Sequence, residues 1–87
     1  MSKLTDLPNI GEKLASKLKM VGINNLQELS EAGSENTIIK IATLQNSGAC
    51  INMLFALEGA IQGVRWHNLS EDRKQDLNTF YQLLNKS

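Results

Sequence analysis

The chain has 87 residues, of which 41% are hydrophobic and 21% are charged, and these values fit one globular domain over residues 1–87. This apolar content excludes an intrinsically disordered chain, and no stretch approaches the roughly 20 apolar residues that a membrane-spanning helix needs. Nine basic and nine acidic residues cancel, so no global charge indicates a nucleic-acid partner, and the single cysteine excludes an internal disulfide.

Residue usage narrows the class further. The first residues carry no signal-peptide, transit or lipidation pattern, so we expect a cytoplasmic protein without a membrane partner. A lone proline and few β-branched runs predict an all-α fold. Charge is unevenly distributed: residues 1–24 have a net charge of +2 and residues 25–36 of −3. An anion-attracting face is therefore expected at the N-terminal end.

The first 22 residues predict a short helical turn, a tight turn and a longer helix. Pro8 ends the first turn, because the residue before a proline is pushed out of the helical region. Asn9 and Gly11 tolerate the positive φ that a tight turn requires. The longer helix is expected over residues 11–21, with Gly22 at its C-terminal end. Its apolar face consists of Ile10, Leu14, Leu18 and Val21.

Two short helices are expected next. Asn25 is positioned to cap the first, and Glu28 three residues later completes a capping-box pattern. This helix should end near Gly33, and Ser34 is predicted to cap the second. The second helix should break at residues 45–48. The inward-facing residues are expected to be Leu26 and Leu29 on the first helix and Ile38, Ile41 and Ala42 on the second.

The stretch from Ala49 to Val64 predicts the central helix. Its apolar side chains cover far more than one stripe, which is typical of a helix buried among others. Cys50 falls within this apolar arc, and Ser47 is expected to cap the helix. The residues that interrupt the arc cluster on the other side: Asn52, Glu58, Gly59 and Gln62. Glu58 and Gln62 are interpreted as the solvent-facing edge of the helix, with a buried polar site as the alternative.

A short connector at residues 65–68 leads to the last helix, which Ser70 is expected to cap. One narrow apolar stripe follows the i, i+3, i+4, i+7 pattern: Leu77, Phe80, Tyr81 and Leu84. The stripe predicts packing on the parent domain. The alternative is exchange with a second copy, since terminal elements on short hinges can swap. Together the segments predict an all-α fold, a small bundle of about five helices around a central apolar helix.

A candidate nucleic-acid site lies in the N-terminal turn, which has the pattern of a helix-hairpin-helix unit. Backbone amides at the start of the second helix point outward there, and with the helix dipole they form an anion site. The site would use the backbone at Asn9, Ile10, Gly11 and Glu12 and the side chains of Lys13 and Lys17. The alternative is a purely structural corner, because the usual motif has glycine where this chain has Asn9, whose side chain would occupy space that the phosphate uses.

A candidate protein-interaction site is formed by Arg65, Trp66 and His67 in the connector, because Trp and Arg are favoured interface anchors. The preferred interpretation is structural. In that interpretation Trp66 closes one end of the core, and Arg65 satisfies carbonyls at the end of the central helix.

Metal binding and catalysis are not expected. His67 is the only histidine and Cys50 the only cysteine, and no further ligands have the spacing of a zinc site. Cys50, expected to be buried, is a poor nucleophile. No paired carboxylates, Ser-His-Asp arrangement or Walker-type loop is visible. We therefore expect no enzyme, no cofactor and no small-molecule substrate.

Three segments resemble the C-terminal domain of the TfoX/Sxy family: LPNIG at residues 7–11, VGINNLQEL at 21–29 and NMLFALEGAIQGVRWHNLS at 52–70. In that family Asn is usual at the position of Asn9. The family's longer members are bacterial regulators of competence for DNA uptake, in which this domain follows an N-terminal one. The resemblance implies a cytoplasmic bacterial protein with a helix-hairpin-helix-like all-α fold and a regulatory setting.

Two functional hypotheses follow. The first is a non-enzymatic regulatory module that binds DNA weakly and without sequence specificity, through phosphate contacts at the hairpin. The second is a protein-interaction module or homodimer that binds no nucleic acid.

Overall fold

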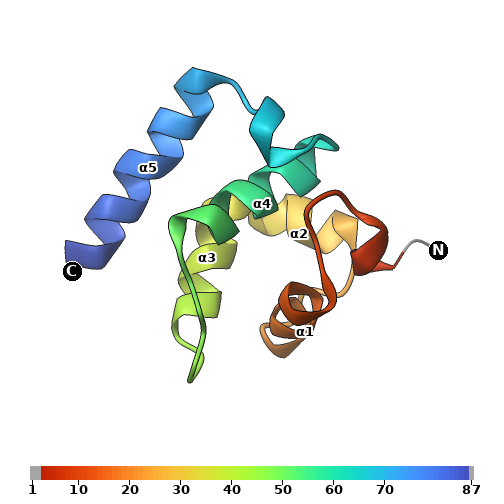
Figure 1. The fold of residues 1–87 in the computed structure, drawn as a ribbon. Helices are drawn as coiled ribbons and strands as arrows, with labels where there is room; N and C mark the ends of the chain where they lie inside the picture. Colours follow the sequence, from red (N-terminus) through yellow and green to blue (C-terminus); the bar gives the residue numbers. More distant parts are fainter. Residues whose placement is uncertain (1–2, 87) are drawn as a thin grey trace.

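The chain forms five α-helices and two short 3-10 helices in a computed structural model that describes residues 3–86 (Figure 1). The elements are η1 (Leu4–Asp6), α1 (Glu12–Met20), α2 (Leu26–Ala32), α3 (Ser34–Ala42), α4 (Ile51–Gln62), η2 (Trp66–Asn68) and α5 (Glu71–Lys86). No strand occurs in residues 3–86, and the prediction of an all-α fold is confirmed. No helix in this range has the length and apolar character needed to cross a membrane.

The centre of the molecule is α4, packed against α3. α4 contacts α2, α3, α5 and η2, and α3 also contacts α1, α2 and α5. α1 and α5 lie on opposite sides of this central pair (Figure 1). The predicted central helix is confirmed, although α3 shares its role. The large apolar side chains that are fully buried come from all five α-helices: Leu18, Leu29, Ile38, Ile41, Leu54, Leu57 and Leu77.

Several helix ends follow the predicted local signals. The Asn25 side-chain oxygen accepts a hydrogen bond from the Glu28 amide at 2.9 Å at the start of α2. The Ser70 hydroxyl accepts one from the Arg73 amide at 3.1 Å at the start of α5. Gly22 follows α1 with a positive φ of 84°. These caps satisfy backbone groups that a helix end leaves without a partner.

Two predicted caps are wrong. Gly33 has a positive φ of 82° and is both the last cap of α2 and the first cap of α3. Ser34 is therefore already helical, and its hydroxyl donates to the Glu58 carboxylate instead of capping α3. Ser47 lies four residues before α4, and its hydroxyl accepts a hydrogen bond from the Ala49 amide instead of capping the helix.

Three predictions of burial are also wrong. Cys50 is exposed because it precedes α4 in extended conformation, with φ −155° and ψ 170°, so the helical projection does not apply to it. Leu26 is the first residue of α2 and is 40% exposed at the edge of the bundle. Ala42 is the last residue of α3 and is exposed, where the chain leaves the core.

Candidate functional site

A tight turn, referred to as the N-terminal hairpin, joins η1 to α1 at Asn9, which has a positive φ of 69°. The Asn9 side chain points into the protein. Its Nδ2 atom donates to the Val64 carbonyl at 3.0 Å, and its Oδ1 atom accepts from the Trp66 amide at 3.1 Å. Nδ2 also donates to the Ala56 carbonyl at 3.5 Å, so three hydrogen bonds hold this side chain against α4 and the segment that follows it. The side chain is therefore directed inward, whereas the sequence places it in the space that a phosphate would use.

Gly59 provides the space for this contact. A Cβ atom at Gly59 would lie 2.5 Å from Asn9 Nδ2 and 2.8 Å from the Val64 carbonyl oxygen. Gly59 is buried, although the sequence groups it with the residues that interrupt the apolar arc. Only glycine allows the hairpin and the Val64–Trp66 backbone to approach α4 this closely.

The start of α1 is open to solvent. Gly11 precedes the helix with extended backbone, and no side chain caps the first turn. Both Glu12 and Lys13 are exposed. Ile10 is different, because it is buried and its amide donates to the Leu7 carbonyl at 3.3 Å. The amides left for an anion are those of the first turn of α1, and the Glu12 carboxylate stands beside them.

The two lysines of the candidate site differ in exposure and in hydrogen bonding. Lys13 is exposed and makes no hydrogen bond or ion pair with any residue from 3 to 86. Lys17 is half-buried, and its ammonium group donates to the Ser47 carbonyl, so it holds the loop between α3 and α4 against α1. Lys13 is therefore the cation of this pair that a phosphate can reach without displacing a structural contact.

The connector after α4 contains the second candidate site. Trp66 is half-buried, and its ring stacks on Phe55 with centroids 6.1 Å apart and on His67 with centroids 3.9 Å apart. His67 and Arg65 are exposed, and no hydrogen bond joins the Arg65 side chain to a carbonyl of residues 3–86. Because Asn9 accepts from the Trp66 amide, the two candidate sites are neighbours although they lie 57 positions apart in the chain.

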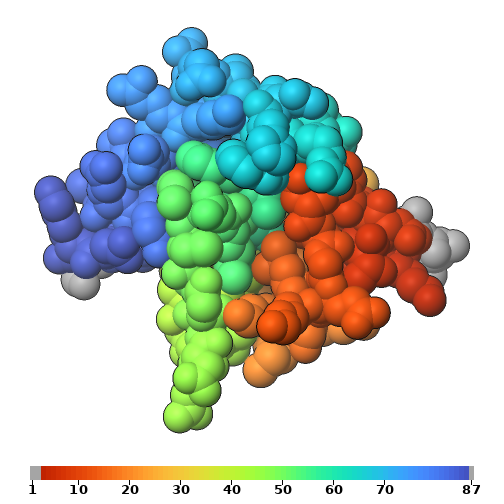
Figure 2. Space-filling model, in the orientation of Figure 1, coloured from red at the N-terminus to blue at the C-terminus, as the bar shows by residue number. Residues whose placement is uncertain are grey.

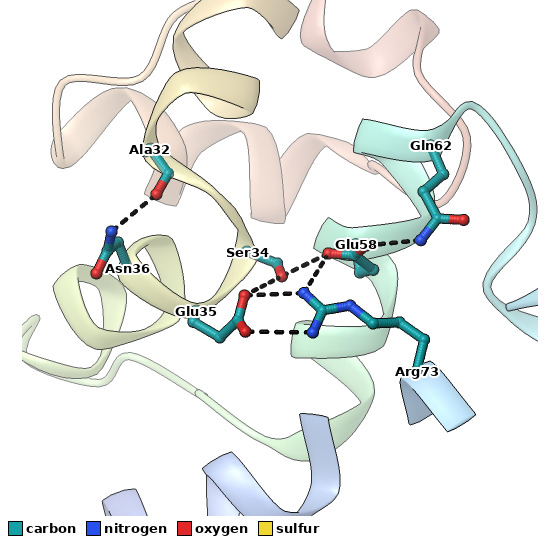
Figure 3. A network of polar contacts seen from close by, with 7 residues as sticks. All are labelled: Ala32, Ser34, Glu35, Asn36, Glu58, Gln62 and Arg73. Carbon is teal, nitrogen blue, oxygen red and sulfur yellow. Dashed lines mark hydrogen bonds and ion pairs between the residues drawn. The ribbon is translucent and has the colours of Figure 1, made fainter. Parts of the chain in front are cut away.

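A buried polar site, the alternative interpretation of Glu58 and Gln62, lies on the other side of α4, with partners from α3 and α5 that the sequence did not indicate (Figure 3). The predicted solvent-facing position of Glu58 is wrong: the residue is 8% exposed. Arg73 Nη2 lies 3.0 Å from Glu58 Oε1 and 2.9 Å from Glu35 Oε1. Ser34 Oγ and Gln62 Nε2 also donate to the Glu58 carboxylate, at 2.7 and 2.6 Å. The network joins α3, α4 and α5.

These contacts shift the pKa of all three charged groups. For Glu35, the hydrogen bonds from Arg73 are the main cause of a lowered pKa. For Glu58, burial by itself raises the pKa, but the hydrogen bonds from Arg73, Gln62 and Ser34 together outweigh it and the pKa is lowered. The two carboxylates in turn raise the pKa of Arg73. Both carboxylates form ion pairs with Arg73, so we interpret the network as structural.

Within residues 3–86, no group of three or more His, Cys, Asp or Glu side chains is placed to hold a metal ion. The fold and these sites define a small helical domain in which an N-terminal hairpin is fastened to the end of a central helix.

The chain belongs to the TfoX C-terminal domain family, which matches residues 1–81. It is 34% identical to the DNA transformation protein TfoX of Haemophilus influenzae, over 88% of this chain and 35% of that protein. It is 36% identical to the protein Sxy of Escherichia coli, over 86% of this chain and 35% of that protein. The chain thus spans about a third of the length of these curated relatives.

Solved structures show the same fold. An uncharacterized protein from Listeria monocytogenes, in a triclinic crystal form, superposes with a TM-score of 0.92 and 42% identity, covering 97% of this chain and 94% of that one. A protein of unknown function from the same organism, in a tetragonal form, gives a TM-score of 0.88 and 43% identity, covering 93% and 98%.

Proposed function

We propose that this chain is a non-enzymatic regulatory module of the bacterial cytoplasm that contacts nucleic-acid phosphates weakly through the start of α1. The observation that carries the proposal is the inward turn of the Asn9 side chain, which leaves the first-turn amides of α1 uncovered beside Lys13. The positive end of a helix dipole and free amides favour an anion. Curated relatives are named DNA transformation proteins, which supports the choice of nucleic acid as the anion.

The first test is fluorescence anisotropy of labelled double- and single-stranded DNA, titrated with the protein at low and moderate salt. We expect binding that weakens steeply as salt increases, because phosphate contacts release counterions. Lys13→Glu should weaken binding. It should also reduce the slope of log K against log salt concentration by about one, because one phosphate contact is lost. Lys86→Glu, the same charge change at the far end of α5, is the matched control. No binding at low salt would contradict the proposal.

A second pair of variants tests the contribution of a backbone amide separately from that of the Glu12 carboxylate. Glu12 is the first residue of α1, where proline is tolerated, and Gly11 before it has the extended backbone that a following proline requires. Glu12→Gln removes a carboxylate and should strengthen DNA binding. Glu12→Pro removes the same carboxylate and also one amide donor, so it should bind more weakly than Glu12→Gln. Equal affinities would show that this amide makes no contact.

The second candidate function is a protein-interaction module that binds no nucleic acid. The observation that favours it is Met20 on α1, which is 66% exposed in a groove beside Lys13.

A further inference from the structure

A groove separates α1 from the loop that joins α3 to α4. It encloses about 270 Å³, with Lys13, Lys17 and Met20 on the α1 side and Leu44 and Asn46 on the loop side. The hydrogen bond from Lys17 to the Ser47 carbonyl holds the two walls together. In Figure 2 this loop (green) projects beyond the rest of the molecule, next to α1 (orange).

The α1 wall combines positive charge with an exposed apolar side chain. Lys13, Lys17 and Met20 follow a four-and-three spacing, so they lie on one face of the helix. No acidic side chain lines the groove. Met20 is 66% exposed, and methionine is common at binding surfaces because it adapts its shape. The groove therefore fits an acidic segment that presents one large apolar side chain.

The outer face of α5 has these properties. Asp72, Asp76, Thr79 and Leu83 are all exposed and follow a four, three and four spacing on one side of the helix, and the exposed Lys86 ends this face after the two aspartates. Leu83 is 63% exposed, and with Met20 it is one of the two most exposed large apolar residues in the region from 3 to 86. The opposite side of α5 is held to the domain by Arg73 and by Tyr81, whose hydroxyl donates to the Ala49 carbonyl at 3.1 Å.

The two faces also match in register. Lys13 precedes Met20 by seven residues and Asp76 precedes Leu83 by seven, which is about 10.5 Å along either helix. Parallel placement of the helices therefore pairs the lysine with the aspartate and the methionine with the leucine. Within one chain α1 and α5 lie on opposite sides of α3 and α4, so the contact needs two molecules (Figure 1).

We propose that the outer face of α5 in one copy docks into the α1 groove of a second copy. Each molecule has one groove and one docking face, so the contact is head-to-tail and continues into longer assemblies or a closed ring. The proposal does not depend on nucleic-acid binding and is tested without it. Since both contacts use Lys13, DNA and a second copy would compete for this surface.

The test is sedimentation velocity over a range of concentrations, with a reducing agent because Cys50 is exposed. We expect wild-type protein to sediment faster as its concentration increases, and the effect to weaken at high salt. Met20→Glu places a carboxylate against the acidic helix, and Leu83→Lys places an ammonium group against the lysines that line the groove. Each should weaken self-association about tenfold or more. Leu26→Glu, at an exposed leucine outside both faces, should not.

Mixing the two variants gives the decisive result. Met20→Glu protein keeps an intact α5 face, and Leu83→Lys protein keeps an intact groove. A one-to-one mixture should form a heterodimer that grows no further, because only one functional contact is left. A wild-type protein that stays monomeric at low salt would overturn the proposal, and this result is also expected if an acidic segment of another protein occupies the groove. Variants that abolish association but do not recombine would equally overturn it.

Discussion

Asn9 shows how one residue can contribute to both local and tertiary structure. Its positive φ forms the hairpin turn, and its side-chain amide bonds to the backbone on both sides of Arg65. Gly59 makes the contact possible because no side chain fills the space. A glycine at position 9, as in the usual helix-hairpin-helix motif, would make the turn but not the attachment.

For this reason Asn9→Gly should lower the free energy of unfolding by about 1–3 kcal/mol, the cost of leaving buried polar groups without partners. Positive φ is retained in the variant, so the loss reports the three hydrogen bonds of the Asn9 side chain. Asn46→Gly is the matched control, because Asn46 also has a positive φ (56°) but is exposed. Urea denaturation measures both, and equal losses would contradict this role of Asn9.

At the scale of secondary-structure elements, the Glu35–Arg73–Glu58 network joins α3, α4 and α5. It supplies charged contacts between α5 and both central helices, in addition to the apolar packing of Leu77. Both carboxylates have a pKa below the ordinary 4.5, so the folded protein binds fewer protons than the unfolded chain in acid. The stabilisation is therefore complete above pH 4.5 and is lost as the pH falls through the lowered pKa values.

We expect the free energy of unfolding, measured by urea denaturation across this acid range, to decrease as the pH falls below 4.5. Arg73→Gln removes the cation but leaves Glu58 buried, and burial raises the pKa of a carboxyl group. The variant should be less stable at pH 7 and should show a smaller decrease in acid. If wild type and variant had parallel pH profiles, the network would not be the origin of the acid sensitivity.

At the scale of the whole molecule, stability depends on α4, which contacts three other α-helices and η2. Leu57 is fully buried on this helix. Leu57→Ala should lower the free energy of unfolding by about 2–5 kcal/mol, because it leaves a cavity where the elements meet. Leu26→Ala, at a leucine that is 40% exposed, should cost less than about 1 kcal/mol in the same denaturation experiment. A loss below about 1 kcal/mol at Leu57 would argue against a core centred on α4.

The sequence by itself determined the helical fold, a central helix within residues 49–64 and the caps at Asn25 and Ser70, because periodicity and capping depend on residues within a few positions of one another. Only the tertiary structure decided that the Asn9 side chain points inward, that Glu58 is buried and that the Lys17 ammonium group is hydrogen-bonded to the Ser47 carbonyl. The partners of these side chains lie 55, 15 and 30 positions away along the chain. A polar residue on a helix has the same local pattern whether it faces water or a distant arginine, so its role depends on how the helices pack.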